Sequence, residues 1–111
     1  MKGMIMKKLN STLTRVIFLL AVAVPGLAWA DGSAAAGAKL ANVCAACHGE
    51  AGISHNDLWP NLAGQKKDYL VKQILAFQSG DRKEPMMMGI VATLSPEDVQ
   101  NVAAYFASLP R

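Results

Sequence analysis

Two cysteines and a histidine, Cys44, Cys47 and His48, lie within five residues and restrict this chain more than any other feature. On a helix, residues three apart lie on one face, so both thiols can point at the same partner. His48 follows four residues after Cys44 and can turn its imidazole toward the same place. This spacing is typical of covalent haem attachment, in which the cysteines form thioethers and the histidine ligates the iron. The chain has one such motif, so one haem is expected.

The same residues could instead form a dithiol or a zinc site. A thioredoxin-like dithiol would need alternating strands and helices, and no segment predicts a βαβ unit. A zinc site would have to combine the motif with His55, but His48 and His55 lack the usual ligand spacing. A chance occurrence in a cytosolic protein would lack the export signal described next. Haem attachment is therefore the preferred interpretation.

Residues 1–30 predict a secretory signal peptide. Basic residues precede a short apolar segment over 16–24, and the small-x-small sequence of residues 28–30 predicts cleavage before Asp31. An uncleaved membrane anchor is the weaker alternative, because the apolar segment is short and Pro25-Gly26 interrupts it. The protein is therefore expected in the periplasm.

The mature segment, residues 31–111, is expected to form one cytochrome-sized domain. A chain this short usually needs a staple such as a metal or cofactor, and a covalently held haem would supply one. The segment carries seven basic and eight acidic residues, a net charge of −1. The net charge of +3 of the full sequence therefore gives no indication of nucleic-acid binding.

Three segments have apolar residues at helical spacing, over 33–48, 66–77 and from Ser95 to Pro110. Gly80 is expected to close the second helix, and Pro96 to occupy the first position of the third. No segment alternates like a strand, so the fold class is all-α. The expected apolar faces contain Gly37, Leu40, Ala41, Cys44, Leu70, Val71, Ile74, Leu75, Phe77, Val99, Val102, Ala103 and Phe106.

The predicted loops cover residues 50–65 and 81–93, and the second contains Met86-Met87-Met88. Three adjacent apolar residues in a loop need a partner. They could fill the core as flexible apolar side chains. For the run as a whole, one thioether is expected to reach the iron as its sixth ligand.

Several motifs together resemble class I cytochrome c. They are the CxxCH motif, Pro-x-Leu at 60–62, Pro-Met-Met at 85–87, Leu-Ser-x-x-Asp at 94–98 and Ala-Ala-Tyr-Phe-Ala-Ser at 103–108. The likeness covers almost all of residues 31–111. It is closest to small bacterial monohaem cytochromes c and to one half of the tandem dihaem bacterial cytochromes c.

The resemblance implies three main helices and two loops wrapped around one covalently attached haem. The first and last helices should cross, with Tyr105 or Phe106 meeting the first helix near Gly37. The ligating methionine of such proteins lies seven residues before the leucine of the Leu-Ser pair. Counted from Leu94, this position is Met87, with Met86 as the second choice.

The resemblance also implies roles around the haem. Cys44 and Cys47 correspond to the thioether pair and His48 to the proximal ligand. Pro60 resembles the proline whose carbonyl accepts the other N–H of that histidine. The haem pocket should also contain Leu62, packed on the haem, and Trp59, although an ordinary core aromatic would look the same as Trp59.

These expectations describe a soluble periplasmic electron-transfer protein that is not an enzyme, with one haem c cycling between ferrous and ferric iron. The expected partners are redox protein donors and acceptors, with a membrane-bound oxidase or reductase as one candidate, and neither nucleic acid nor a small-molecule substrate. Two alternatives stay open. One is a haem c subunit of a larger periplasmic oxidoreductase, and the other is a ligand-binding or peroxidase-like haem protein.

Overall fold

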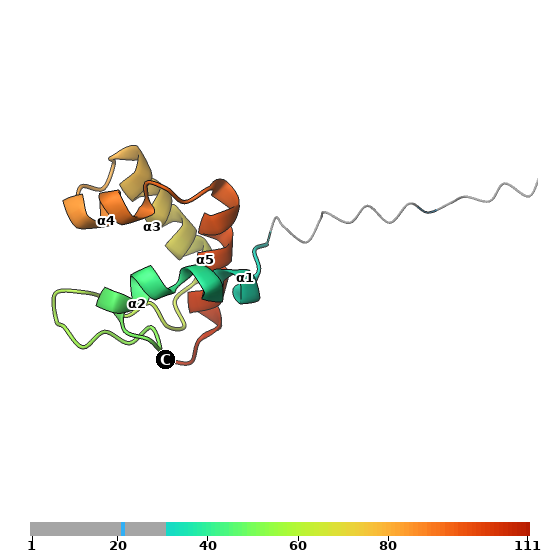
Figure 1. The fold of residues 1–111 in the computed structure, drawn as a ribbon, viewed down its shortest axis with the longest axis horizontal. Coiled ribbons are helices and arrows are strands. Elements are labelled where there is room, and N and C mark those ends of the chain that lie inside the picture. The colour runs from blue at the N-terminus through green and yellow to red at the C-terminus, as the bar shows by residue number, and fades with distance from the viewer. Residues whose placement is uncertain (1–20, 22–30) are drawn as a thin grey trace, which may run out of the picture.

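The computed structural model describes Ala21 and residues 31–111, so the predicted signal peptide lies, apart from Ala21, outside the described residues. The elements are α1 (Ala34–Leu40), α2 (Asn42–His48), α3 (Lys67–Ser79), α4 (Pro85–Val91) and α5 (Pro96–Ser108) (Figure 1). No strand occurs among the described residues, which agrees with the all-α class. None of the helices in this part of the chain is both long and apolar enough to cross a membrane.

The prediction of a single helix over 33–48 is wrong in one respect, because the structure divides this segment at Ala41 into α1 and α2. Ser33 caps α1, with its hydroxyl accepting from the Ala36 N–H at 3.2 Å. Ala41 keeps helical dihedral angles, and its carbonyl accepts from the Ala45 N–H at 2.8 Å. The apolar spacing continues through this bend, so the sequence pattern alone could not reveal it.

The first and last helices cross at a glycine, as the resemblance implies. Gly37 of α1 is buried against α5, and a Cβ there would overlap the Asn101 carbonyl and lie 2.8 Å from Cβ of Tyr105. Asn101 is itself buried, and its side-chain oxygen accepts from the Ser33 N–H at 2.8 Å. This polar contact between α1 and α5 was not anticipated from the sequence.

The core lies where α3 and α5 pack beside the bend between α1 and α2. Its buried members are Ala41, Leu70, Val102, Ala103 and Phe106. Val99 and Phe77 are also buried, as expected, but Leu75 was wrongly placed on the apolar face of α3 because its side chain is 46% exposed.

The ends of α3 and α5 follow the sequence signals closely. Gly80 adopts the left-handed conformation at the C-terminus of α3, with φ of 80°. At the start of α5, the Ser95 hydroxyl accepts from the Asp98 N–H, and the Asp98 carboxylate accepts from the Ser95 N–H. This capping box and Pro96 fix the beginning of the last helix.

The prediction of a loop over 81–93 is wrong, because most of this segment forms α4. Pro85 occupies the first turn, and the Glu84 carboxylate accepts from the Met87 N–H at 2.8 Å. This is the same start as that of α5, with a capping side chain before a proline. The helix has only seven residues and no alternation of polar and apolar faces, so its periodicity is too weak to detect. It packs against α3 (Figure 1).

Candidate functional site

Helix α2 presents Cys44, Cys47 and His48 on one face. The three positions are separated by three and four residues, which places them together on a helix. Both cysteines are free thiols and half-buried, and His48 is only 7% exposed. Burial raises the pKa of the Cys44 thiol, and the charge of Cys47 adds to the rise, while a hydrogen bond to the backbone opposes it. The Cys44 thiol is therefore neutral at neutral pH.

The orientation of His48 is set by Pro60. The Nδ1 atom of His48 lies 2.7 Å from the Pro60 carbonyl oxygen. A proline carbonyl can only accept, so Nδ1 donates its hydrogen, and Nε2 is the nitrogen with a free lone pair in the neutral imidazole. Nε2 is then the nitrogen that can bind a metal. The contact itself is the one that the resemblance implied.

The loop between α2 and α3 holds the Pro60 carbonyl in place. The Gly52 carbonyl accepts from the N–H groups of Leu62 at 2.8 Å and Ala63 at 3.0 Å, which closes the base of the loop. Gly52 has φ of 73°, and a Cβ there would lie 2.9 Å from the Ala63 nitrogen. Farther out, the Asn61 side-chain oxygen accepts from the Ser54 N–H at 2.7 Å. Asn61, the residue next to Pro60, is thus hydrogen-bonded to the opposite side of the loop.

The expected pocket residues Trp59 and Leu62 lie on the same loop. Leu62 packs against the core cluster. Trp59 keeps 37% of its surface exposed. The loop therefore brings Pro60 to His48 and Leu62 to the core, while Trp59 lies at the surface.

The methionines on α4 differ in their surroundings. Met86 is 55% exposed, while Met87 and Met88 are half-buried. Met87 lies four residues before Val91, the buried residue of α4, so the two share a face. The Met88 side chain reaches Gly80, where a Cβ would lie 4.0 Å from its Cε atom.

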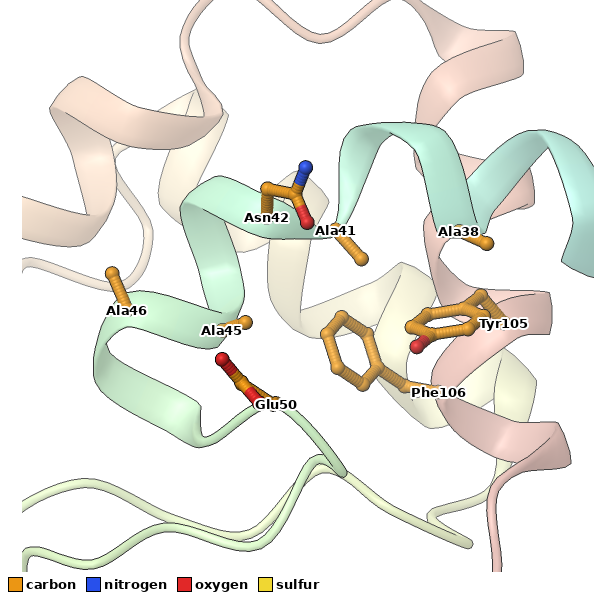
Figure 2. A pocket seen from close by; sticks show the side chains of 8 residues that line it. All are labelled: Ala38, Ala41, Asn42, Ala45, Ala46, Glu50, Tyr105 and Phe106. Atoms are coloured by element: carbon orange, nitrogen blue, oxygen red, sulfur yellow. The ribbon is translucent and has the colours of Figure 1, made fainter.

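A cavity of about 420 Å³ lies beside α2 (Figure 2). Asn42, Ala45 and Ala46 line it, and these positions face away from Cys44 and Cys47 on the helix. Tyr105 and Phe106 of α5 form its other wall, as Figure 2 shows. The cavity is therefore distinct from the face that carries the thiols and His48.

Haem c requires two free thiols beside each other and an imidazole nitrogen with a free lone pair. The residues of α2 fit both needs, because Cys44 and Cys47 share a face and the Pro60 contact occupies Nδ1 of His48, which leaves Nε2 as the nitrogen that can bind the iron. A thiolate or imidazole zinc site fits less well, since no group of three or more potential metal-ligating His, Cys, Asp or Glu side chains gathers within the described residues.

Residues that sequence reasoning missed are those whose partners are far along the chain. Asn101 contacts Ser33, and Gln78 of α3 donates to the carbonyl oxygens of Val91 and Leu94. Neither contact has a local sequence signature. Glu84 did have one, because it precedes a proline at the start of α4.

The comparisons with known proteins agree with this site. Residues 34–110 match the family model of cytochrome c. The chain is 46% identical over 93 residues to cytochrome c4 of Pseudomonas aeruginosa, covering 84% of this chain and 46% of that protein. It is 40% identical over 80 residues to cytochrome c-554(548) of Halomonas halodenitrificans, covering 69% of this chain and 96% of that protein.

A solved structure gives the same result for the fold. The thiosulfate dehydrogenase of Marichromatium purpuratum is similar with a TM-score of 0.68 and 33% identity, covering 72% of this chain and 20% of that chain. The chain spans about half the length of the cytochromes c4 that it matches. The family match covers most of the chain, and the fold is that of class I members. The chain therefore belongs to the cytochrome c family, and its cofactor is covalently attached haem c.

Proposed function

We propose that this protein is a single-haem electron carrier of the periplasm. Cys44 and Cys47 form the thioethers, and His48 and Met87 are the axial ligands. The observation that carries the proposal is the 2.7 Å contact between His48 Nδ1 and the Pro60 carbonyl. His48 lies on the same short helix as the two thiols. When bound, haem supplies a reversible one-electron change between ferric and ferrous iron.

The histidine and the methionine have different tasks. Nδ1–H donation to Pro60 makes the His48 imidazole a better donor through Nε2 and keeps its plane fixed. Met87 contributes a neutral, soft thioether that favours ferrous iron and raises the reduction potential. Two ligands on separate, packed helices change little between oxidation states, which keeps the reorganisation on electron transfer small.

Met87 is preferred over its neighbours because of its place on α4. It shares the inner face of the helix with buried Val91, while Met86 is 55% exposed on another face. Met88 is directed toward Gly80 at the end of α3. Met87 is thus the methionine whose side chain is half-buried without contacting the end of α3 at Gly80.

The protein acts as a carrier and not as an enzyme on its own. His48 and Met87 would both hold the iron of bound haem, which would leave no ligand position for a substrate. Its partners are redox proteins that donate or accept electrons through small, short-lived interfaces. A membrane-bound oxidase or reductase is one such partner, and no nucleic acid or small-molecule substrate is involved.

Export supports this role. Residues 1–30 are proposed as a cleaved signal peptide, with residues 31–111 as the mature domain. An oxidising compartment would favour a disulfide between two unused cysteines. Thioether bonds to haem remove that alternative for Cys44 and Cys47.

A second candidate is a haem subunit of a larger oxidoreductase. The observation that favours it is the likeness to the thiosulfate dehydrogenase of Marichromatium purpuratum, of which the matched part is 20%. A domain of this kind is thus part of a larger enzyme in that protein. Size-exclusion chromatography of the protein from its native periplasm separates the two, because a subunit elutes with its partner and a carrier elutes alone.

The axial ligand is tested by replacing single methionines. Met87→Ala should open the iron, so that the ferrous protein binds carbon monoxide and its reduction potential falls. Met86→Ala is the matched control on the same helix and should keep the wild-type spectrum. If Met86→Ala binds carbon monoxide and Met87→Ala does not, the assignment of Met87 is wrong.

A further inference from the structure

Helix α4 has only seven residues, so it depends on contacts from outside itself. Isolated helices of this length are unstable in water, because too few hydrogen bonds compensate the cost of forming the first turn. Each helix end also leaves backbone groups without a partner inside the helix. The position of α4 therefore depends on what binds its two ends.

The N-terminal end is held by Glu84. Its carboxylate accepts from the Met87 N–H at 2.8 Å, and its carbonyl accepts from the Met88 N–H at 2.9 Å. Both contacts are local, because Glu84 directly precedes the helix. They order the first turn but do not fix α4 against the rest of the fold.

The C-terminal end is held from another helix by Gln78. The Nε2 atom of Gln78, in the last turn of α3, donates to the Val91 carbonyl at 2.8 Å and to the Leu94 carbonyl at 3.0 Å. Val91 ends α4, and Leu94 lies just before α5. A single side-chain amide thus connects α3 to the end of α4 and to the turn that follows it.

The segment between α3 and α4 is anchored separately. The Arg82 N–H donates to the Ala76 carbonyl at 3.0 Å, and its guanidinium donates to the Gln73 side-chain oxygen at 2.9 Å. The same guanidinium lies 4.5 Å from the centre of the Phe77 ring. With this segment fixed, the C-terminal end of α4 is held by the Gln78 amide and by the packing of buried Val91.

We propose that Gln78 is a positioning residue for the methionine ligand. By fixing the C-terminal end of α4, it keeps the face shared by Val91 and Met87 toward the core. The Met87 side chain would then already be placed to ligate the iron when haem is bound. This inference rests on the proposed assignment of Met87 as a ligand. Gln78 itself does not touch the cofactor.

Three variants test this role in the haem-loaded protein. Gln78→Met keeps the length and volume of the side chain but removes both hydrogen bonds. Gln78→Lys keeps a donor, and its positive charge suits the carbonyl end of a helix. Gln100→Met makes the same chemical change in α5 and serves as the matched control, because the backbone of Gln100 lies against Gly32 at the start of the described domain.

Two measurements are made on each variant. The first is amide hydrogen exchange of residues 86–92, followed by mass spectrometry. Gln78→Met should exchange about tenfold faster there, the loss expected for one part-buried and one exposed hydrogen bond. The second is carbon monoxide binding to the ferrous protein. It should be absent in the wild type and in Gln100→Met, appear in Gln78→Met, and be suppressed again in Gln78→Lys.

The outcomes separate this inference from the proposed function. Unchanged exchange over 86–92 in Gln78→Met overturns the role of Gln78, whatever ligand the iron has. Faster exchange without carbon monoxide binding, in a protein whose Met87→Ala variant does bind it, shows that Gln78 orders the helix without positioning the ligand and also overturns it. If Met87→Ala itself keeps the wild-type spectrum, the ligand assignment fails, and the role of Gln78 toward that ligand fails with it.

Discussion

The Nδ1 atom of His48 donates to the carbonyl oxygen of Pro60 at 2.7 Å, across twelve residues of chain. This contact connects the helix that carries both thiols to a loop that has no helix or strand of its own. Because the acceptor is a backbone oxygen, its position depends on how the loop folds and not on the side chain of Pro60. The loop therefore sets the orientation of the His48 imidazole.

Asn61 offers a way to test this dependence. Asn61→Ala removes the 2.7 Å hydrogen bond to the Ser54 N–H and should lower the free energy of unfolding by about 1 kcal/mol. A more mobile Pro60 carbonyl would accept a weaker hydrogen bond from His48 Nδ1. The imidazole would then donate less strongly to the iron, so the reduction potential should rise. A redox titration and thermal unfolding measure the two effects.

Asn56→Ala is the control, because the Asn56 oxygen accepts only locally, from the Leu58 N–H at 2.8 Å. It should change stability slightly and leave the potential at the wild-type value. Equal potentials in both variants would contradict the role assigned to the loop.

The crossing of α1 and α5 depends on a missing side chain at Gly37. Gly37→Ala would place a Cβ onto the Asn101 carbonyl, so the free energy of unfolding should fall by about 3 kcal/mol as the helices separate. Gly89→Ala is the opposite case, because nothing lies within 4 Å of the new Cβ in α4, and it should stabilise the protein by about 0.5–1 kcal/mol. Denaturant unfolding of both variants tests the pair, and effects of the same sign would contradict the packing described here.

Asn101 forms a buried polar link between the same two helices. Asn101→Leu keeps the size of the side chain but leaves the Ser33 N–H without its 2.8 Å partner. The expected loss of unfolding free energy is about 1–3 kcal/mol, the cost of an unsatisfied donor. The midpoint of urea unfolding measures it. A midpoint equal to that of the wild type would show that the contact contributes nothing net.

Covalent attachment is tested by removing the thiols. In a protein with both Cys44→Ala and Cys47→Ala, haem should be extracted by acidified organic solvent, whereas the wild-type chain should retain it. Each single substitution should leave one thioether, visible as haem that stays on the chain in a denaturing gel. Haem retained covalently by the double variant would require a different attachment site.

The fold could be predicted where structure follows from local sequence. The ends of α3 and α5 were recognisable because Gly80, Ser95 and Pro96 act through their own dihedral angles and hydrogen bonds. The bend at Ala41 and the short α4 were not. The apolar spacing runs unbroken through Ala41, and α4 is stabilised at its far end by Gln78, a contact that no local pattern encodes.

The candidate site could likewise be predicted from the sequence only in part. The face shared by Cys44, Cys47 and His48 follows from helical spacing, while the contact with Pro60 was expected only from the resemblance to class I cytochrome c. Asn61 lies next to Pro60, yet its bond to Ser54 depends on how the loop closes on itself. Sequence reasoning thus named the groups proposed to bind the cofactor, and Pro60 beside them, but not the loop residues such as Asn61 that hold Pro60 in place.

The most direct test of the proposed carrier is a visible absorption spectrum of the purified mature protein, oxidised, then reduced, then exposed to carbon monoxide. A low-spin haem c with His48 and Met87 as ligands should give sharp bands on reduction that the gas leaves unmoved. A high-spin spectrum that shifts when the gas is added would contradict a closed six-coordinate iron, and ligand binding or peroxidase-like chemistry would then replace electron transfer as the function.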